Sequence, residues 1–236
     1  MLRIFIGFDP RETVAYHAMV QSILENTSVP VALTPLALAH LGGALERVRD
    51  PLQSTDFAFS RFLVPSLCGF EGWALFMDCD MIVLEDLAAL FELCDDNYAV
   101  QVVKHDHRPP ETKKFLAQKQ TRYQKKNWSS VMLFNNAKCR ALSSAYVNSA
   151  TGLDLHQFKW LENETEIGAL PARWNHLVGY SDAIEDPAVL HFTTGGPWYD
   201  DYRNCDYSNV WRKYWALAQR VIEKHKNASS EVAEVP

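Results

Sequence analysis

The chain has 236 residues, of which 47% are hydrophobic and 22% are charged, proportions that are typical of a folded globular protein. Its net charge is −6, and no long basic face runs along it, which argues against a general nucleic-acid-binding protein. Its apolar runs are shorter than the ~18 residues that are needed to cross a bilayer.

The N-terminus and the cysteines both indicate a cytoplasmic protein. Residues 1–9 contain an apolar run that is too short for a secretory signal peptide and that fits a strand better. The five cysteines show no CxxC spacing, and their number is odd. This pattern favours free thiols in a reducing compartment over a disulfide framework or a zinc site.

The chain opens with the pattern of a doubly wound α/β sheet. Residues 2–7 are apolar and end at a glycine, which predicts a strand, and residues 13–25 have helical spacing. Residues 29–38 predict a second strand. Ligands of such sheets bind beyond the carboxyl ends of the strands. Phe8 and Asp9, which follow the first strand, are therefore candidate binding residues.

Residues 74–83 place two carboxylates one residue apart between two apolar runs. The first run predicts a buried strand, and side chains two apart on an extended chain point the same way, so we expect Asp78 and Asp80 to converge. Burying two adjacent carboxylates without a partner is costly, and a divalent cation such as Mn²⁺ or Mg²⁺ removes that cost. The alternative for such a short motif is a solvated turn with two surface acids.

Four other side chains are candidates for the same site. Arg61 lies in a predicted helix over residues 57–67, with its head either in water or directed at an anion. Asn135 ends a predicted strand, where an amide can bind sugar hydroxyls or form a turn. His191 ends a strand before a Gly-Gly turn, either as a metal ligand or as a satisfied core residue. Glu166 adjoins an ordered apolar stretch, so it is the acid of its segment that we expect to be fixed in place.

Residues 104–126 carry a net charge of +6, which leaves −12 on the rest of the chain. The segment has little apolar content and includes two adjacent prolines, so we expect a flexible loop. It follows a predicted strand over residues 98–103. One interpretation is a positive lid over a phosphorylated ligand, and the other is a solvated surface loop.

Residues 210–226 predict a C-terminal amphipathic helix with tryptophans on its apolar stripe and basic residues mostly off it. Such a stripe usually packs against a core, whereas a basic amphipathic helix can also lie on an anionic membrane, so peripheral membrane contact is the second interpretation. Residues 227–236 are expected to form a disordered tail. We therefore expect one domain over residues 1–226.

Three features together resemble a known family. They are the first strand and turn with Asp9, the carboxylate pair within residues 76–80, and a late strand in which His191 precedes Gly195-Gly196-Pro197-Trp198. They resemble the nucleotide-sugar glycosyltransferases of the GT-A fold, and are most similar to the retaining family that contains glycogenin and the bacterial lipopolysaccharide galactosyltransferases. The likeness spans residues 1–200. It implies a Rossmann-like mixed α/β sheet flanked by helices in a single domain.

The resemblance also implies roles for individual residues. The loop after the first strand would hold the uracil and ribose of the donor, and the carboxylate pair with the late histidine would hold Mn²⁺ and the diphosphate. A helix arginine before the pair would touch the donor. In this chain the loop residues are Gly7, Phe8 and Asp9, with Tyr16 as a stacking partner. The residues for the ion and the diphosphate are Asp78, Asp80 and His191, and the helix arginine is Arg61.

The chain departs from that family at two points. A lysine that reaches the diphosphate usually precedes the Pro-Trp pair, whereas here Gly196 stands before Pro-Trp, so Lys104 or the basic segment is the candidate replacement. The family's Asp-Gln pair near the reacting sugar carbon has no match, and Glu166 is the candidate catalytic substitute. Asn135, Gly196 and Trp198 complete the expected donor contacts.

The function expected from these residues is a metal-dependent transfer of a hexose from a UDP-sugar to a sugar or glycolipid hydroxyl, with retention of configuration. The first alternative is a nucleotidyltransferase that makes sugar nucleotides, although the turn after the first strand has one glycine rather than a glycine-rich phosphate loop. The second alternative is a non-catalytic protein that binds sugar nucleotides.

Overall fold

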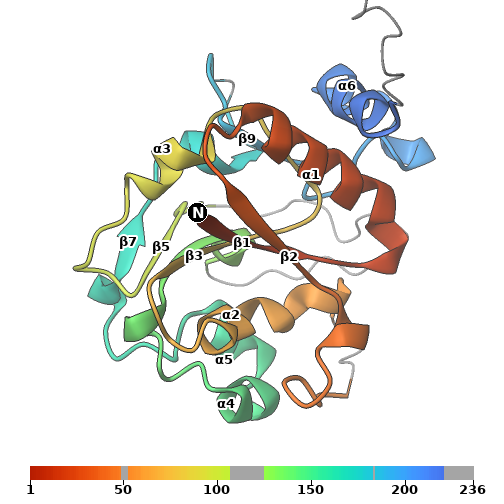
Figure 1. The fold of residues 1–236 in the computed structure, drawn as a ribbon. Helices are drawn as coiled ribbons and strands as arrows, with labels where there is room; N and C mark the ends of the chain where they lie inside the picture. The colour runs from red at the N-terminus through yellow and green to blue at the C-terminus, as the bar shows by residue number, and fades with distance from the viewer. Residues whose placement is uncertain (49–52, 107–124, 183, 221–236) are drawn as a thin grey trace, which may run out of the picture.

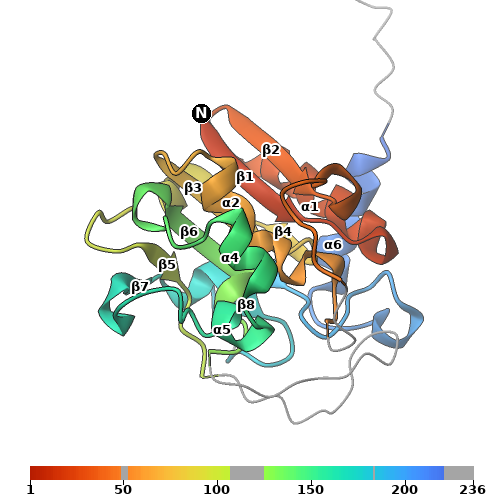
Figure 2. The same cartoon turned by 90° about the horizontal axis from the view of Figure 1, so that it is seen from below.

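The computed structural model describes residues 1–48, 53–106, 125–182 and 184–220. A six-stranded mixed sheet has the order β2-β1-β3-β6-β5-β7, with α2, α4 and α5 on one side and α1 and α6 on the other (Figures 1 and 2). Its strands are Leu2–Gly7 (β1), Val31–Leu36 (β2), Trp73–Met77 (β3), Val100–Val102 (β5), Val131–Asn135 (β6) and Ile167–Ala169 (β7). The α/β architecture expected from the sequence is confirmed.

The α-helices are Thr13–Asn26 (α1), Val64–Leu67 (α2), Leu87–Phe91 (α3), Ser144–Ser149 (α4), Gly152–His156 (α5) and Ser208–Ala218 (α6). A second, three-stranded sheet has the order β4-β9-β8 and consists of Met81–Val83 (β4), Val189–His191 (β9) and His176–Leu177 (β8). Since β4 begins four residues after β3 ends, the two sheets meet at the carboxylate pair.

The N-terminal β1-α1-β2 unit follows the sequence prediction, and β3 pairs with β1 in the same direction. The edge strand β2 runs through Pro35, because an edge strand tolerates a missing N–H on its outer side. Parallel strands end at one edge of a sheet. The loop after β1 and the loop after β3, with Asp78, therefore lie at the same edge.

The sheet corrects the expectation for two residues, one through the direction of its strand and one through its position before its strand. Strand β6 runs against β3. Asn135 pairs with Trp73 at the start of β3, so it lies at the edge opposite to Asp78. Glu166 comes just before β7, which is parallel to β5, and its carbonyl accepts a hydrogen bond from Ala99 at that same opposite edge. The structure therefore does not bring Asn135 or Glu166 to the carboxylate pair.

The single helix predicted over residues 57–67 is wrong. The segment forms two 3₁₀ turns, Asp56–Ala58 and Ser60–Leu63, and only then the short helix α2. Pro65 lies in the first turn of α2 and has no N–H to donate to the carbonyl of residue 61, so one α-helix cannot continue through it. The turns bury Arg61 under the sheet instead of leaving it on a helix surface.

Helix α6 packs on α1 and closes a second, smaller core. The side chain of Asn26 at the end of α1 donates to the hydroxyl of Tyr214 (2.9 Å) and to the carbonyl of Val83 (3.0 Å), which ties α1, β4 and α6 together. Trp211 and Tyr214 are buried in this core. The apolar stripe of α6 therefore faces the protein, as the first interpretation of the C-terminal helix expects.

Several expectations from the sequence fall outside the described residues. These include most of the basic segment 104–126, the end of the helix predicted over 210–226, and the tail 227–236. Within the described ranges, none of the helices has the length and apolar character of a membrane span.

The end of β1 provides a test of how the fold is packed. A Cβ atom at Gly7 would lie 2.4 Å from the ring of Phe57, which is buried. Gly7→Ala is therefore expected to lower the free energy of unfolding by about 1–3 kcal/mol, as other overpacked core substitutions do. The measurement is urea unfolding followed by circular dichroism.

The matched control is Gly42→Ala, since a Cβ there meets nothing within 4 Å. This variant is expected to keep the parent stability or to gain up to about 1 kcal/mol through the unfolded state. Equal unfolding midpoints for the two variants would contradict the close approach of Gly7 and Phe57.

Candidate metal centre and donor site

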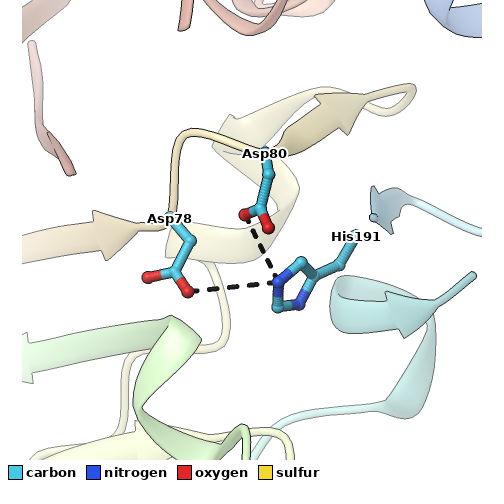
Figure 3. Close-up of side chains that lie close together, drawn as sticks. All are labelled: Asp78, Asp80 and His191. Carbon is cyan, nitrogen blue, oxygen red and sulfur yellow. Dashed lines mark ion pairs between the residues drawn. The ribbon is translucent and has the colours of Figure 1, made fainter. Parts of the chain in front are cut away.

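Three side chains converge where the two sheets meet (Figure 3). Asp78 follows β3, Asp80 precedes β4, and His191 is the last residue of β9. The Nε2 atom of His191 lies 3.3 Å from an oxygen of Asp80 and 4.0 Å from an oxygen of Asp78. The structure thus brings together the three residues that the sequence analysis assigned to a metal.

Backbone pairing fixes this arrangement. Met81 is opposite His191 in the antiparallel β4–β9 pair, and Phe192 N–H donates to the carbonyl of Asp80 (2.9 Å), so Asp80 and His191 are held side by side. On the other side, Asp78 N–H donates to the carbonyl of Ser130 at the start of β6 (3.0 Å). The convergence is therefore a consequence of strand register.

The residue between the two acids does not join the set. Cys79 is fully buried, and this burial, together with the nearby acids Glu12, Asp80 and Asp78, raises the pKa of its thiol well above the ordinary value. A protonated thiol is a poor metal ligand, because metals bind the thiolate. The candidate donor atoms are thus carboxylate oxygens and one imidazole nitrogen.

The donor set fits a divalent cation. One potential ligand atom from each of Asp78, Asp80 and His191 lies within 4.8 Å of the other two, and in the described part of the chain this is the one such group of acidic, histidine or cysteine ligands. Two carboxylates and an imidazole suit a cation such as Mn²⁺. A cation between them would also offset the repulsion of two close carboxylates.

Arg61 lies against this set and is almost completely buried, so the interpretation that its head is in water is wrong. Its guanidinium lies 2.8 Å from an oxygen of Asp78 and donates to the carbonyl of Ser129 (2.8 Å). The rings of Phe57 and Phe76 flank the guanidinium at 5.2 and 4.9 Å from their centroids. Arg61 is therefore directed at an anion, and in this structure that anion is the carboxylate of Asp78.

His156, which was not among the residues predicted for the site, supports this arginine through Ser129. Its Nδ1 lies 2.7 Å from the hydroxyl of Ser129, and its ring packs edge-on against Phe62. Burial, together with the positive charge of Arg61, lowers the pKa of His156 well below the ordinary value, so the ring is neutral at pH 7. Its neighbours come from distant segments, and for this reason no local motif marks it.

Asp9 organises the loop after β1. One carboxylate oxygen accepts from the N–H and Nε of Arg11 (both 2.9 Å), and the other accepts from Arg11 and from Asp56 N–H (3.1 Å). Burial alone would raise the pKa of Asp9, but these hydrogen bonds outweigh it and hold the pKa below its ordinary value. Next to this loop, the rings of Phe8 and Tyr16 meet edge to face at 5.4 Å.

Gly196 and Trp198 have a packing role in the structure. A Cβ at Gly196 would lie 2.0 Å from the indole of Trp198, so a side chain at this position would displace that ring. Trp198 in turn contacts the rings of Phe192 and Trp211. The small core beneath α6 therefore requires glycine where the resemblance implies a lysine.

Lys104, the candidate replacement for that lysine, is not brought to the candidate metal ligands. Its ammonium donates to the carbonyl of Ile167 (2.7 Å) on the edge strand β7 and lies near the ring of Trp128. Two strands, β6 and β5, separate β3 from β7 in the sheet.

A cavity of about 400 Å³ lies beyond β8, and six of its lining residues are His105, Asp106, His176, Leu177, Tyr180 and Asp182. The cavity is adjacent to the metal ligands through the β8–β9 pair, in which Leu177 is opposite His191. Burial lowers the pKa of His176, so its imidazole is neutral at pH 7. The wall thus combines neutral polar groups, carboxylates and apolar surface.

The chain is similar to known proteins both in sequence and in structure. The sequence matches the family described as Glycosyl transferase family 8 over residues 10–201. It is 44% identical over 218 residues to Protein CDI of Arabidopsis thaliana, covering 89% of this chain and 84% of that protein. The family match includes all three candidate metal ligands.

Three solved structures have the same fold. The bifunctional glycosyltransferase WbbM has a TM-score of 0.65 and 13% identity, and the match covers 91% of this chain and 49% of WbbM. GlyE of Streptococcus pneumoniae TIGR4 has a TM-score of 0.59 and 17% identity, with 92% of this chain and 61% of GlyE covered. Galactosyltransferase LgtC, in complex with donor and acceptor sugar analogues, has a TM-score of 0.60 and 13% identity, with 94% of this chain and 98% of LgtC covered. The chain thus spans about half of WbbM, three fifths of GlyE and nearly all of LgtC.

These findings confirm the family that the sequence resemblance indicated. The family match extends over most of the chain, and the mixed sheet with its flanking helices agrees with the glycosyltransferase structures. The chain belongs to glycosyl transferase family 8 and is a glycosyltransferase of the GT-A fold.

Proposed function

We propose that the protein transfers a hexose from a UDP-sugar to a hydroxyl of a saccharide or glycolipid, and that it uses Mn²⁺. The observation that carries this proposal is the convergence of Asp78, Asp80 and His191 at the edge of the sheet. A divalent ion at this position supplies Lewis-acid stabilisation of the charge that develops on a departing diphosphate.

The nucleoside of the donor is proposed to lie at the end of β1. Phe8 and Tyr16 offer aromatic surface there, and Asp9 holds the loop through Arg11 and Asp56. A carboxylate accepts about four hydrogen bonds, and Asp9 already accepts four from the protein. We therefore assign Asp9 to shaping the nucleoside pocket.

The acceptor is proposed to occupy the cavity beyond β8, on the opposite side of the metal ligands from β1. Its two lining acids, Asp106 and Asp182, favour a neutral polyhydroxylated acceptor over a phosphorylated one.

In the transfer, the bond between the sugar and the diphosphate breaks, and the acceptor oxygen bonds to the same sugar carbon. For a retaining reaction, the acceptor proton would pass to the departing diphosphate oxygen, because Glu166 lies at the other edge of the sheet.

The proposed location is the cytoplasm, without membrane contact through α6. Cys68, Cys79, Cys94, Cys139 and Cys205 are all free thiols, as expected in a reducing compartment. The buried aromatic residues of α6 belong to the small core and are not available to a lipid surface.

The two alternative functions, a nucleotidyltransferase and a non-catalytic binding protein, are set aside, since the family is one of glycosyltransferases.

Replacing Asp80 tests the role of the carboxylate pair in turnover. Asp80→Asn is expected to lower the release of UDP from a UDP-hexose by about a thousandfold or more, because several kcal/mol of Lewis-acid stabilisation are lost. The metal-free variant should unfold at the same temperature as the parent or higher, since one of two close negative charges is removed. UDP release and thermal unfolding are the measurements.

Asp201→Asn is the matched control, because Asp201 is an exposed acid outside the metal ligands. It is expected to leave UDP release unchanged. Parent-like UDP release by Asp80→Asn would remove the carboxylate pair from the proposed mechanism.

Thermal unfolding with UDP and Mn²⁺ tests the donor site without any acceptor. Each ligand at about 100 times its Kd stabilises the native state by about 2.7 kcal/mol, which for a chain of this size raises Tm by roughly 5–10 °C. UDP is expected to produce this shift only when Mn²⁺ is present, because Asp78, Asp80 and His191 would hold the ion that offsets the charge of the diphosphate. A shift with UDP alone that Mn²⁺ does not increase would refute the metal-dependent donor site.

A further inference from the structure

The side chain of Asn175 forms hydrogen bonds on the side of His191 that faces away from the two carboxylates, and it has no role in the transfer proposed above. Asn175 is fully buried, and its side-chain oxygen lies 2.9 Å from Nδ1 of His191. Its side-chain nitrogen lies 2.9 Å from the hydroxyl of Ser130 and 3.3 Å from the carbonyl of Asn127. All these atoms belong to residues that are less than one-tenth exposed.

The partners of this amide fix its orientation. The carbonyl of Asn127 can only accept a hydrogen bond, so the amide atom facing it must be the NH₂ group. The hydroxyl of Ser130 donates to the same carbonyl (2.6 Å) and is therefore able to accept from Asn175. The oxygen of Asn175 must then face His191, since the reversed amide would place two acceptors against each other.

This orientation determines which nitrogen of His191 carries a proton. The amide oxygen accepts only, so Nδ1 of His191 is the protonated nitrogen. In the neutral imidazole, the lone pair is then on Nε2, the atom that faces Asp78 and Asp80. The imidazole is thereby prepared to bind a cation between the two carboxylates.

Ser130 connects both sides of the donor set. Its carbonyl accepts from Asp78 N–H, and its hydroxyl holds the amide that holds His191. Asn127, which begins this turn, has a left-handed backbone (φ 65°), a conformation that asparagine tolerates better than most residues. Two ligands that are more than a hundred residues apart in sequence are thus positioned from one short turn.

We propose that Asn175 is a positioning residue for metal binding, which orients His191 and sets its tautomer, with Ser130 as the anchor of both ligands. The proposal rests on the function proposed above for Asp78, Asp80 and His191. It predicts that the amide acts through His191 on the affinity for the ion. Partners of this kind around metal ligands contribute about 10–100-fold to metal affinity.

The test is the affinity of the full chain for Mn²⁺ alone, measured from the electron paramagnetic resonance signal of the free ion. Asn175→Leu, which keeps the volume and removes the acceptor, is expected to bind Mn²⁺ about 10–100-fold more weakly than the parent. In a chain that carries His191→Ala, the added Asn175→Leu should cause no further loss, because the amide acts through the imidazole.

Asn148→Leu is the matched control. The side chain of Asn148 also makes three hydrogen bonds, to Glu46 N–H and to the carbonyls of Ala44 and Ser144, but it lies on α4. This variant is expected to bind Mn²⁺ like the parent. If the parent itself does not bind Mn²⁺, the proposed function fails. If the parent binds Mn²⁺ and Asn175→Leu binds it equally well, the positioning role fails. The positioning role also fails if the loss of Mn²⁺ affinity caused by Asn175→Leu adds fully to the loss caused by His191→Ala.

A measurement on the parent keeps the proposal testable even if Asn175→Leu does not fold. In alkaline solution, the nitrogen chemical shifts of the metal-free chain report which nitrogen of His191 carries the proton in the neutral imidazole. The expected result is a proton on Nδ1. A proton on Nε2 would overturn the proposal.

Discussion

The site depends on the mutual repulsion of two carboxylates that strand geometry holds close together. Asp78 and Asp80 flank a fully buried cysteine and lie at the junction of the two sheets, where strand pairing fixes their backbones close together. Each acid has a neighbour from a distant segment, with the guanidinium of Arg61 against Asp78 and the imidazole of His191 against Asp80. The β4–β9 pairing places His191 beside Asp80, and the buried turn before α2 places Arg61 beside Asp78.

The sequence predicted the part of this site that depends on parallel strands. The β1-α1-β2 unit and the apolar run before Asp78 are local patterns, and they place the end of β1 and the end of β3 at one edge of the sheet. The motif around His191 pointed to a ligand, and the β4–β9 register brings it to Asp80. That register could not be derived from periodicity, because both strands are only three residues long.

The structure places Asn135 and Glu166 away from the carboxylate pair for two different reasons. Asn135 ends β6, which runs against β3, whereas Glu166 comes before β7, which runs in the same direction as β3. Apolar periodicity is the same for both directions of a strand. No local pattern marks His156 or decides between the two interpretations of Arg61, since the hydroxyl and the anion that they meet belong to segments far away in sequence.

The position of Gly196 shows that the departure from the family's usual lysine is built into the packing of this chain. The indole of Trp198 covers that glycine and continues through Trp211 into the small core under α6. A lysine at position 196 would have to displace the ring of Trp198, which helps to hold α6 in place. The absence of a lysine here is therefore coupled to the packing of the C-terminal helix. In the part of the chain that the structure describes, the cation that contacts the carboxylate set is Arg61, which the phenylalanine rings and the Ser129 carbonyl hold in place. Within these residues, the positive charge beside the carboxylate pair therefore comes from beneath β3 rather than from the loop after β9.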